Sequence, residues 1–177
     1  FYKGRGDLDI VTQAETRDHW PDIRNDLERL GKALTIAEAV DQIGQDRQPD
    51  QGLYQMLCGG LETLHLADPA LIVPAFMLKL LAHEGVAPEL NECVIGGETS
   101  ALEYFDPGTG GVTCVDHRRG RPISSAALEL MRATLGGALA TVLEVQQAPH
   151  TDEVSALTHR LWEFHVERRL RSTELLQ

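Results

Sequence analysis

The sequence predicts a mainly α-helical fold, in which a helical bundle is interrupted by a small β insertion and preceded by a single remnant strand. Over most of the chain, apolar residues recur at steps of three and four, which is the period of an amphipathic helix. This period stops between Pro88 and His117, where glycines and two cysteines are gathered. At the start of the chain, apolar and polar residues alternate instead, and this alternation is typical of a strand.

The length, net charge and cysteine content exclude several classes of protein. With 177 residues, 42% of them hydrophobic, the chain can bury the core of one good-sized domain. A net charge of -11 excludes a protein that coats nucleic acid through its overall charge, so any DNA contact requires a local basic patch. Three cysteines are too few for a disulfide framework, which predicts a reducing, cytoplasmic location. No apolar run is long enough to span a bilayer, so we expect no membrane partner.

Residues 1–17 are predicted to be the end of a β-domain. Gly4 and Gly6 indicate a turn, and the alternation that follows predicts a strand up to about Ala14. A single strand is not stable by itself. Because the chain starts without Met and already within this pattern, we expect an upstream segment to supply the other strands. Residues 18–177 are predicted to form the helical domain, with the β insertion at residues 88–122.

Three helices are predicted before the insertion. The first runs from Trp20 to about Gly44 and carries a core-facing stripe, whose members are Ile23, Leu27, Leu30, Leu34 and Ala37. The second covers residues 53–64. The third, from residue 68 to residue 85, is apolar on nearly all sides and is therefore the expected central, buried helix.

Two further helices are predicted after the insertion. Ser124 or Ser125 is the expected N-cap of the fourth helix, whose apolar stripe extends to Leu139. Residues 148–150 are predicted to be a linker, and the last helix follows this linker and reaches Leu176.

The insertion has the cysteine spacing of a zinc ribbon. Cys93 belongs to a first short knuckle, and Cys114 and His117 belong to a second, so the two knuckles supply three ligands. The glycine-rich residues between them indicate a hairpin, as a ribbon requires. Gly96 stands where the second cysteine of the first knuckle is expected. The predicted ligand set is therefore incomplete.

Three interpretations of this incomplete set remain open. In the first, zinc is bound, and Asp116, another histidine or water is the fourth ligand. In the second, the site is eroded, zinc is absent or weakly bound, and packing holds the ribbon. In the third, the spacing is accidental. The missing ligand favours zinc that is absent or weakly bound. A zinc ion with an open position would activate water, which keeps a zinc-dependent hydrolase among the alternatives.

Three groups of basic residues are candidates for binding. Arg118, Arg119 and Arg121 follow the second knuckle, where they suit DNA phosphates or, alternatively, form a solvated loop. Lys3 and Arg5 lie on the first turn and are also candidate DNA-binding residues. The third group lies near the end of the last helix, where the helix dipole alone stabilises cations, or where a basic rim captures an acidic peptide or DNA. This group consists of Arg168, Arg169 and Arg171.

Taken in order, several stretches resemble one family of bacterial proteins, the recombination mediator RecO. The resemblance covers nearly the whole chain, and it rests on the order and spacing of the stretches together. These are residues 3–8 (KGRGDL), residues 20–34, residues 76–93 up to Cys93, the glycines Gly97, Gly110 and Gly111 with Cys114, and residues 167–172 (ERRLRS).

The resemblance implies a DNA repair and recombination protein that is not an enzyme. Residues 1–17 would be the end of the family's N-terminal OB-fold, whose larger part would lie upstream. Such proteins bind single- and double-stranded DNA and anneal complementary strands. They also bind the acidic tail of the single-stranded DNA-binding protein, and they join RecR to help load RecA. The family's zinc pattern has four cysteines, whereas this chain has Gly96 and His117 at the second and fourth places.

We therefore expect a cytoplasmic, nucleoid-associated protein that works by binding. The chain has no phosphate-binding loop and no nucleophile motif, which agrees with a protein that is not an enzyme. One alternative is a helical adaptor that binds only other proteins. The other is the zinc-dependent hydrolase.

Overall fold

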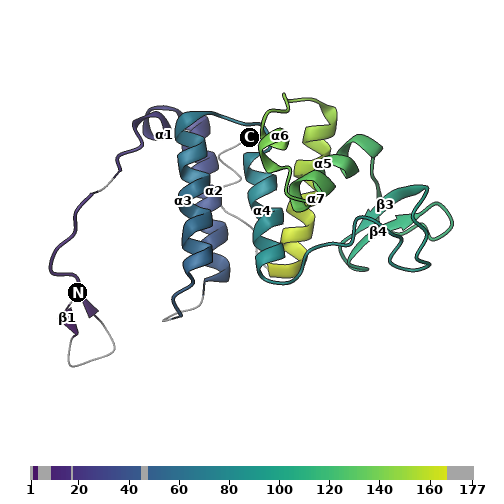
Figure 1. Cartoon of the computed structure of the whole chain (residues 1–177), viewed down its shortest axis with the longest axis horizontal. Helices are drawn as coiled ribbons and strands as arrows, with labels where there is room; N and C mark the ends of the chain where they lie inside the picture. The colour runs from purple at the N-terminus through teal and green to yellow at the C-terminus, as the bar shows by residue number, and fades with distance from the viewer. Residues whose placement is uncertain (1, 4–8, 17, 45–47, 167–177) are drawn as a thin grey trace.

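The computed structural model describes residues 2–3, 9–16, 18–44 and 48–166, and it confirms the mainly helical fold with a small β-sheet (Figure 1). The helices are α1 (Pro21–Asn25), α2 (Leu27–Ile43), α3 (Gln51–Leu66), α4 (Ile72–His83), α5 (Ser125–Leu135), α6 (Leu139–Leu143) and α7 (Pro149–Val166). The strands are β1 (Tyr2–Lys3), β2 (Asp9–Ile10), β3 (Leu102–Asp106), β4 (Gly111–Cys114) and β5 (Arg121–Pro122). No helix in the described part combines the length and the apolar character needed to cross a membrane.

Helix α4 is the central helix, as the sequence predicts. From Ile72 to Leu81 every residue except Lys79 is buried. Helices α2, α3, α5 and α7 all contact α4, and together they enclose it (Figure 1). The helix begins at Ile72 rather than at residue 68, so Pro74 falls within its first turn, where the missing N–H group of proline costs no hydrogen bond.

The single helix predicted from Trp20 to Gly44 is wrong, because the chain breaks at Asp26. This residue is extended, and its Oδ1 atom accepts hydrogen bonds from the backbone N–H groups of Glu28 at 2.9 Å and of Arg29 at 3.1 Å. Asp26 is thus the N-cap of a new helix, α2, which begins one residue later. Asp26 therefore starts a new helix, although it lies within a stretch whose apolar residues recur at helical spacing.

The predicted core-facing stripe is confirmed at Ile23, which is buried, and Leu30 is half-buried against the core, but the other three members of the stripe are exposed. Leu27 is 74% exposed and Leu34 is 43% exposed, and Ala37 also faces solvent. The buried residues of α2 include Ala33, Ile36 and Ala39 instead. This real stripe is displaced from the predicted one by a single residue, which corresponds to a rotation of about 100° around the helix axis. The break at Asp26 resets the helical phase between α1 and α2, so a stripe that starts at Ile23 in α1 does not continue onto the buried face of α2.

The helix predicted after the insertion ends early. Ser124 is its N-cap, and the Oγ atom accepts a hydrogen bond from the N–H of Ala127 at 3.2 Å. Gly136 ends α5, and Gly137 has a φ angle of +97°, a conformation that only glycine adopts without strain. Leu139 therefore begins a separate helix, α6, so the prediction of one continuous helix up to this residue is wrong.

The last helix begins earlier than predicted. The expected linker at residues 148–150 supplies its first turn, because α7 begins at Pro149, a residue whose fixed φ angle suits this position. Thr151 secures this start, since its Oγ1 atom donates to the carbonyl of Ala148 at 2.7 Å. The predicted extension to Leu176 lies outside the described residues.

At the N-terminus, β1 and β2 form an antiparallel pair in which Tyr2 lies opposite Ile10. The predicted strand ends at Ile10 rather than near Ala14, because residues 11–16 have no regular secondary structure and are exposed. That residues 1–17 are the end of an OB-fold stays a prediction.

Strands β3, β4 and β5 form an antiparallel sheet in the order β4-β3-β5, which we call the ribbon. The ribbon shares one buried core with the helices, to which it contributes Phe105 and Val112. The chain on either side of the strands adds Leu90, Cys93 and Ile123 to this core. The ribbon also touches the chain that leads into it, since Gly111 forms a parallel bridge with Glu89. A Cβ atom at Gly111 would overlap the Glu89 backbone, so only glycine allows this close approach.

We expect Ile36→Ala to lower the free energy of unfolding by about 2–5 kcal/mol, because it empties a core position. Leu34→Ala, in the same helix, is the matched control and should change it by about 0.5 kcal/mol or less, because Leu34 is 43% exposed. Urea denaturation followed by circular dichroism measures both. A larger destabilisation by Leu34→Ala would mean that the predicted stripe, and not the observed one, faces the core.

Candidate metal centre and basic surface

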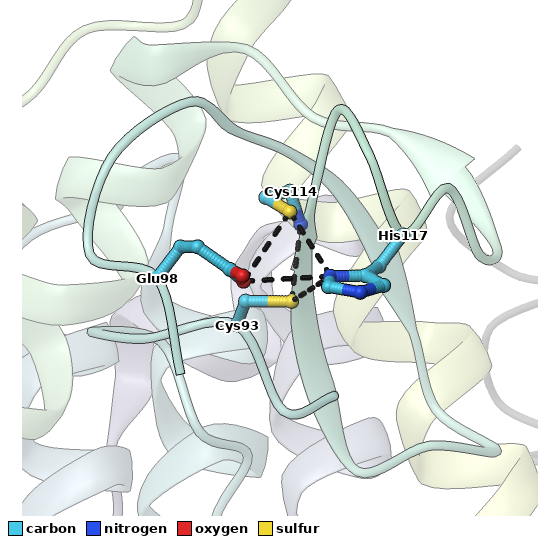
Figure 2. A group of neighbouring side chains, drawn as sticks. All are labelled: Cys93, Glu98, Cys114 and His117. Carbon is cyan, nitrogen blue, oxygen red and sulfur yellow. Dashed lines mark hydrogen bonds and ion pairs between the residues drawn. The ribbon is translucent and has the colours of Figure 1, made fainter. Parts of the chain in front are cut away.

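Four side chains of metal-binding type meet at the ribbon: those of Cys93, Glu98, Cys114 and His117. One ligand atom from each lies within 4.8 Å of the other three (Figure 2). The structure thus brings together the three ligand candidates of the sequence and adds Glu98 to them. Cys93 and Cys114 are buried, whereas His117 and Glu98 lie toward solvent with 34% and 42% of their side chains exposed.

Two tight turns position these side chains. In the first, the N–H of Gly97 donates to the carbonyl of Cys93 at 2.8 Å, and the N–H of Cys93 donates to the carbonyl of Glu98 at 2.7 Å. In the second, the N–H of His117 donates to the carbonyl of Cys114 at 3.1 Å. The two turns are joined because the N–H of Val94 donates to the carbonyl of Val112 at 3.0 Å. Backbone hydrogen bonds therefore hold the four donors together.

The distances between the donor atoms suit a tetrahedral zinc site. The Nδ1 atom of His117 lies 3.3 Å from Sγ of Cys114 and 3.6 Å from Sγ of Cys93. The Oε2 atom of Glu98 lies 3.4 Å from that Nδ1 atom and 3.5 Å from Sγ of Cys114. Zinc bonds of about 2.3 Å to sulfur and about 2.0–2.1 Å to nitrogen or oxygen place neighbouring ligand atoms roughly 3.3–3.8 Å apart in a tetrahedron, with the two sulfur atoms at the upper end of this range. Two thiols, an imidazole and a carboxylate are ligands that zinc accepts.

Glu98 is the residue that the sequence interpretation missed. Asp116, which the sequence offers as a fourth ligand, is exposed and does not belong to the cluster. A Cβ atom built on Gly96 would overlap the Glu98 carboxylate and the ring of His117. Glycine at position 96 therefore leaves the space that the carboxylate occupies. The signal in the sequence was an acidic residue two positions after the gap in the cysteine pattern.

The protonation of the four groups is coupled through their contacts. Burial opposes ionisation of the Cys93 thiol, but backbone N–H groups and the His117 side chain stabilise its thiolate, and the net effect lowers its pKa to about 7. Burial raises the pKa of the Cys114 thiol. The hydrogen bond to Cys93 raises the pKa of His117, and the negative charge of Glu98 adds to this effect. The backbone N–H of Glu98 lowers the pKa of its carboxyl.

The three basic residues in and beside the ribbon, Arg118, Arg119 and Arg121, are exposed to solvent. The Arg118 guanidinium lies 5.8 Å from the centre of the Tyr104 ring, and its Nε atom donates to the carbonyl of Val115 at 3.0 Å. These contacts fix its direction.

The arginines do not all share one face of the sheet. Tyr104 lies opposite Pro122 on β5, whereas the next residue of β3, Phe105, lies opposite Arg121. Successive residues of a strand point to opposite faces, so Arg121 lies on the other face from Tyr104. Arg119 stays near Tyr104, because its N–H donates to Thr113, which pairs with Tyr104 across β3 and β4. Arg118 and Arg119 therefore form the basic surface.

The remaining basic candidates fall on parts that the structure does not describe. Lys3 lies in β1, but its side chain is outside the described parts. Arg5, and with it the C-terminal group Arg168, Arg169 and Arg171, lies outside the described residues.

A groove of about 780 Å³ runs between the ribbon and α5, next to Tyr104. Three carboxylates line it, those of Glu103, Glu129 and Glu153. The Arg132 guanidinium also lines the groove, but it is paired with Glu129. Such a lining repels phosphate and other anions.

The amino-acid sequence of the chain is similar to those of known DNA repair proteins. The family model described as "Recombination protein O C terminal" matches residues 24–174. The DNA repair protein RecO of Desulforamulus reducens is 29% identical over 99% of this chain and 71% of its own length. That of Roseiflexus sp. is 35% identical over 81% of this chain and 53% of its own length. That of Streptomyces griseus is 34% identical over 98% of this chain and 72% of its own length.

We expect the affinity of this cluster for zinc to fall as the pH is lowered. Zinc displaces protons from Cys114 and His117, whose pKa values are raised, and below about pH 7 it must also displace the proton of Cys93. The decrease should be about tenfold or more per pH unit, and steeper below pH 7. Competition with a coloured chelator measures it, and Cys58→Ser, outside the cluster, should show the same profile. An affinity that does not change with pH would contradict this ligand set.

Proposed function

The chain belongs to the RecO family of DNA repair proteins, and from this premise we propose that it binds DNA, anneals complementary strands and, with RecR, helps to load RecA onto single-stranded DNA. The match of the family model over residues 24–174 is the observation that supports the proposal most strongly. The role in DNA repair and recombination follows from the family itself. What we propose beyond the family role is strand annealing, the loading of RecA, the partners, and association with the nucleoid in the cytoplasm.

The basic surface of the ribbon is the proposed DNA contact in the described part of the chain. Arg118 is held in place over Tyr104, and Arg119 lies beside it. A guanidinium that is held in place, as that of Arg118 is, suits a phosphate, and an aromatic ring beside it suits a base. The net charge of -11 confines such contact to a small area. Lys3, Arg5 and Arg121 are proposed to add to the contact.

The proposed contact with the acidic tail of the single-stranded DNA-binding protein involves Arg168, Arg169 and Arg171. Their sequence supplies three cations within four positions. Arginine pairs with carboxylates through two parallel hydrogen bonds, which makes it suited to an acidic peptide. The proposal rests on sequence alone, and RecR is proposed as a partner on the family premise.

We also propose that Cys93, Glu98, Cys114 and His117 hold one zinc ion with a structural role. When bound, zinc would cross-link the two turns of the ribbon, whose donor atoms already lie at tetrahedral separations. Four protein ligands fill the coordination shell and leave no position for a reactive water, which favours a structural site over a hydrolytic one. This arrangement supports a protein that works by binding rather than by catalysis.

One observation favours a second candidate function, the helical adaptor that binds only proteins. Leu27 and Leu34 are exposed on one face of α2, and exposed apolar side chains suit a protein partner. The two candidates differ in whether the chain binds DNA, so a DNA-binding measurement separates them.

Arg118→Glu is expected to weaken binding of a labelled single-stranded oligonucleotide by roughly tenfold, because it replaces a cation beside a phosphate by a repulsive charge. The slope of log K against log salt should fall by about 0.7 for each phosphate that the variant no longer neutralises. Fluorescence anisotropy at several salt concentrations measures both. Arg160→Glu is the matched control, since it changes the charge equally at an exposed position of α7.

Equal weakening in the two variants would mean that only net charge matters, and the ribbon would not be the contact surface. A chain that binds no DNA even at low salt would support the protein-only adaptor.

The double variant Gly96→Cys, Glu98→Ala should bind zinc more tightly than the natural chain, by roughly tenfold or more, because a thiolate suits zinc better than a carboxylate does. The ring of His117, which a Cβ atom at position 96 would also overlap, has to turn aside in this variant and in the single variant. The single variant Gly96→Cys should gain less, because its new side chain overlaps the Glu98 carboxylate. Zinc content and chelator competition measure the difference. If Glu98→Ala alone leaves zinc affinity unchanged, Glu98 is not a ligand.

A further inference from the structure

The two cysteines of the cluster face each other. Their Sγ atoms lie within 4.8 Å, and both contact the same Nδ1 atom of His117 (Figure 2). The backbone N–H of Cys114 donates to Sγ of Cys93 at 3.4 Å, so the two residues come from backbone segments in direct contact. A disulfide bond requires a separation of about 2.05 Å. The sulfur atoms therefore need to approach by less than about 3 Å.

A disulfide between Cys93 and Cys114 would remove both sulfur ligands from the metal site. The chain has three cysteines, and the third, Cys58, lies on α3 and does not belong to the cluster. Two of the four donors are thus sulfur atoms, and a single disulfide would use both. After its formation only Glu98 and His117 would remain as donors, and two ligands do not make a stable zinc site.

We propose that Cys93 and Cys114 are a site of reversible oxidation, at which hydrogen peroxide forms a disulfide and thereby removes the capacity of the ribbon to bind metal. The inference rests on the metal site proposed above.

The chemistry balances with peroxide as the oxidant. The sulfur of one thiolate attacks a peroxide oxygen, the O–O bond breaks, and a sulfenic acid and hydroxide form. The second thiolate attacks the sulfenic sulfur, the S–S bond forms, and a second hydroxide leaves. The hydroxide ions take up two protons and become water. Two electrons pass from the two sulfur atoms to the two oxygen atoms of one peroxide molecule.

Access to the sulfur atoms is controlled by the other two donors. Cys93 and Cys114 are each only 2% exposed, whereas the side chains of His117 and Glu98 are 34% and 42% exposed. Peroxide is small enough to pass these two side chains when they move apart. The sulfur atoms also belong to the core shared by the ribbon and the helices. A disulfide would keep the two turns joined, so we expect the oxidised chain to stay folded.

The test treats the reduced, zinc-loaded chain with hydrogen peroxide. We expect two of the three thiols to disappear, the mass to fall by about 2 Da, and about one zinc per chain to reach a coloured chelator. Peptide mapping should join the peptides that contain Cys93 and Cys114, and a dithiol reductant should restore both thiols and zinc uptake. Circular dichroism should report unchanged helix content. Cys58→Ser, the matched control, should release zinc in the same way.

The outcomes separate this inference from the proposed metal site. If the chain takes up zinc and then keeps its metal and all three thiols under peroxide, the inference is overturned and the metal site stands. A disulfide that joins Cys58 to either partner, or sulfinic acid without any disulfide, also overturns it. If the reduced chain takes up no zinc at all, the metal site itself fails, and the regulation proposed here fails with it.

Discussion

The rest of the structure depends on the burial of α4. Its apolar side chains point in every direction, so the helix is stable in water only when other elements surround it. Helices α2 and α3 precede it in the chain, and α5 and α7 follow the ribbon, yet all four contact it. Enclosing α4 therefore brings the two ends of the ribbon back to the same core. The ribbon is positioned by this closure, and its own strands are too short to be stable alone.

The sequence allows the fold to be predicted where burial is complete or where a strong local signal exists. Helix α4 is apolar on nearly all sides, so its burial can be predicted without knowing which of its faces points to the core. The pair Ser124 and Ser125 locates the helix start to within one residue, because a hydroxyl before an apolar run is a strong cap signal, and the structure has Ser124 as the cap. The face of α2 could not be predicted, because Asp26 caps the helix from inside an apolar period and shifts its phase. Such a break depends on tertiary packing, which decides between two helices and one.

The candidate site was only partly predictable. The spacing of ligands along the sequence identifies residues that follow a known pattern, but it does not identify other residues that the fold brings close to them. Cys93, Cys114 and His117 stand at ribbon spacing, and the structure brings them together. Glu98 has no fixed place in that pattern. It reaches the site because the turn after Cys93 folds back, with Gly97 at a φ of +78°. In the same way, adjacent arginines look like one patch in the sequence, but strand alternation sends Arg121 to the other face.

The overlap between a side chain at position 96 and the Glu98 carboxylate also constrains which residues the two positions can hold together in evolution. In a lineage that starts with cysteine at position 96, an acidic residue at position 98 has no room to turn inward, so it brings no benefit as a ligand. Once glycine replaces the cysteine, the same acidic residue can fill the space. An acidic residue at position 98 can therefore act as a ligand only where position 96 has no side chain, whichever of the two changes came first. Homologues should accordingly show cysteine at position 96 or an inward acid at position 98, and rarely both.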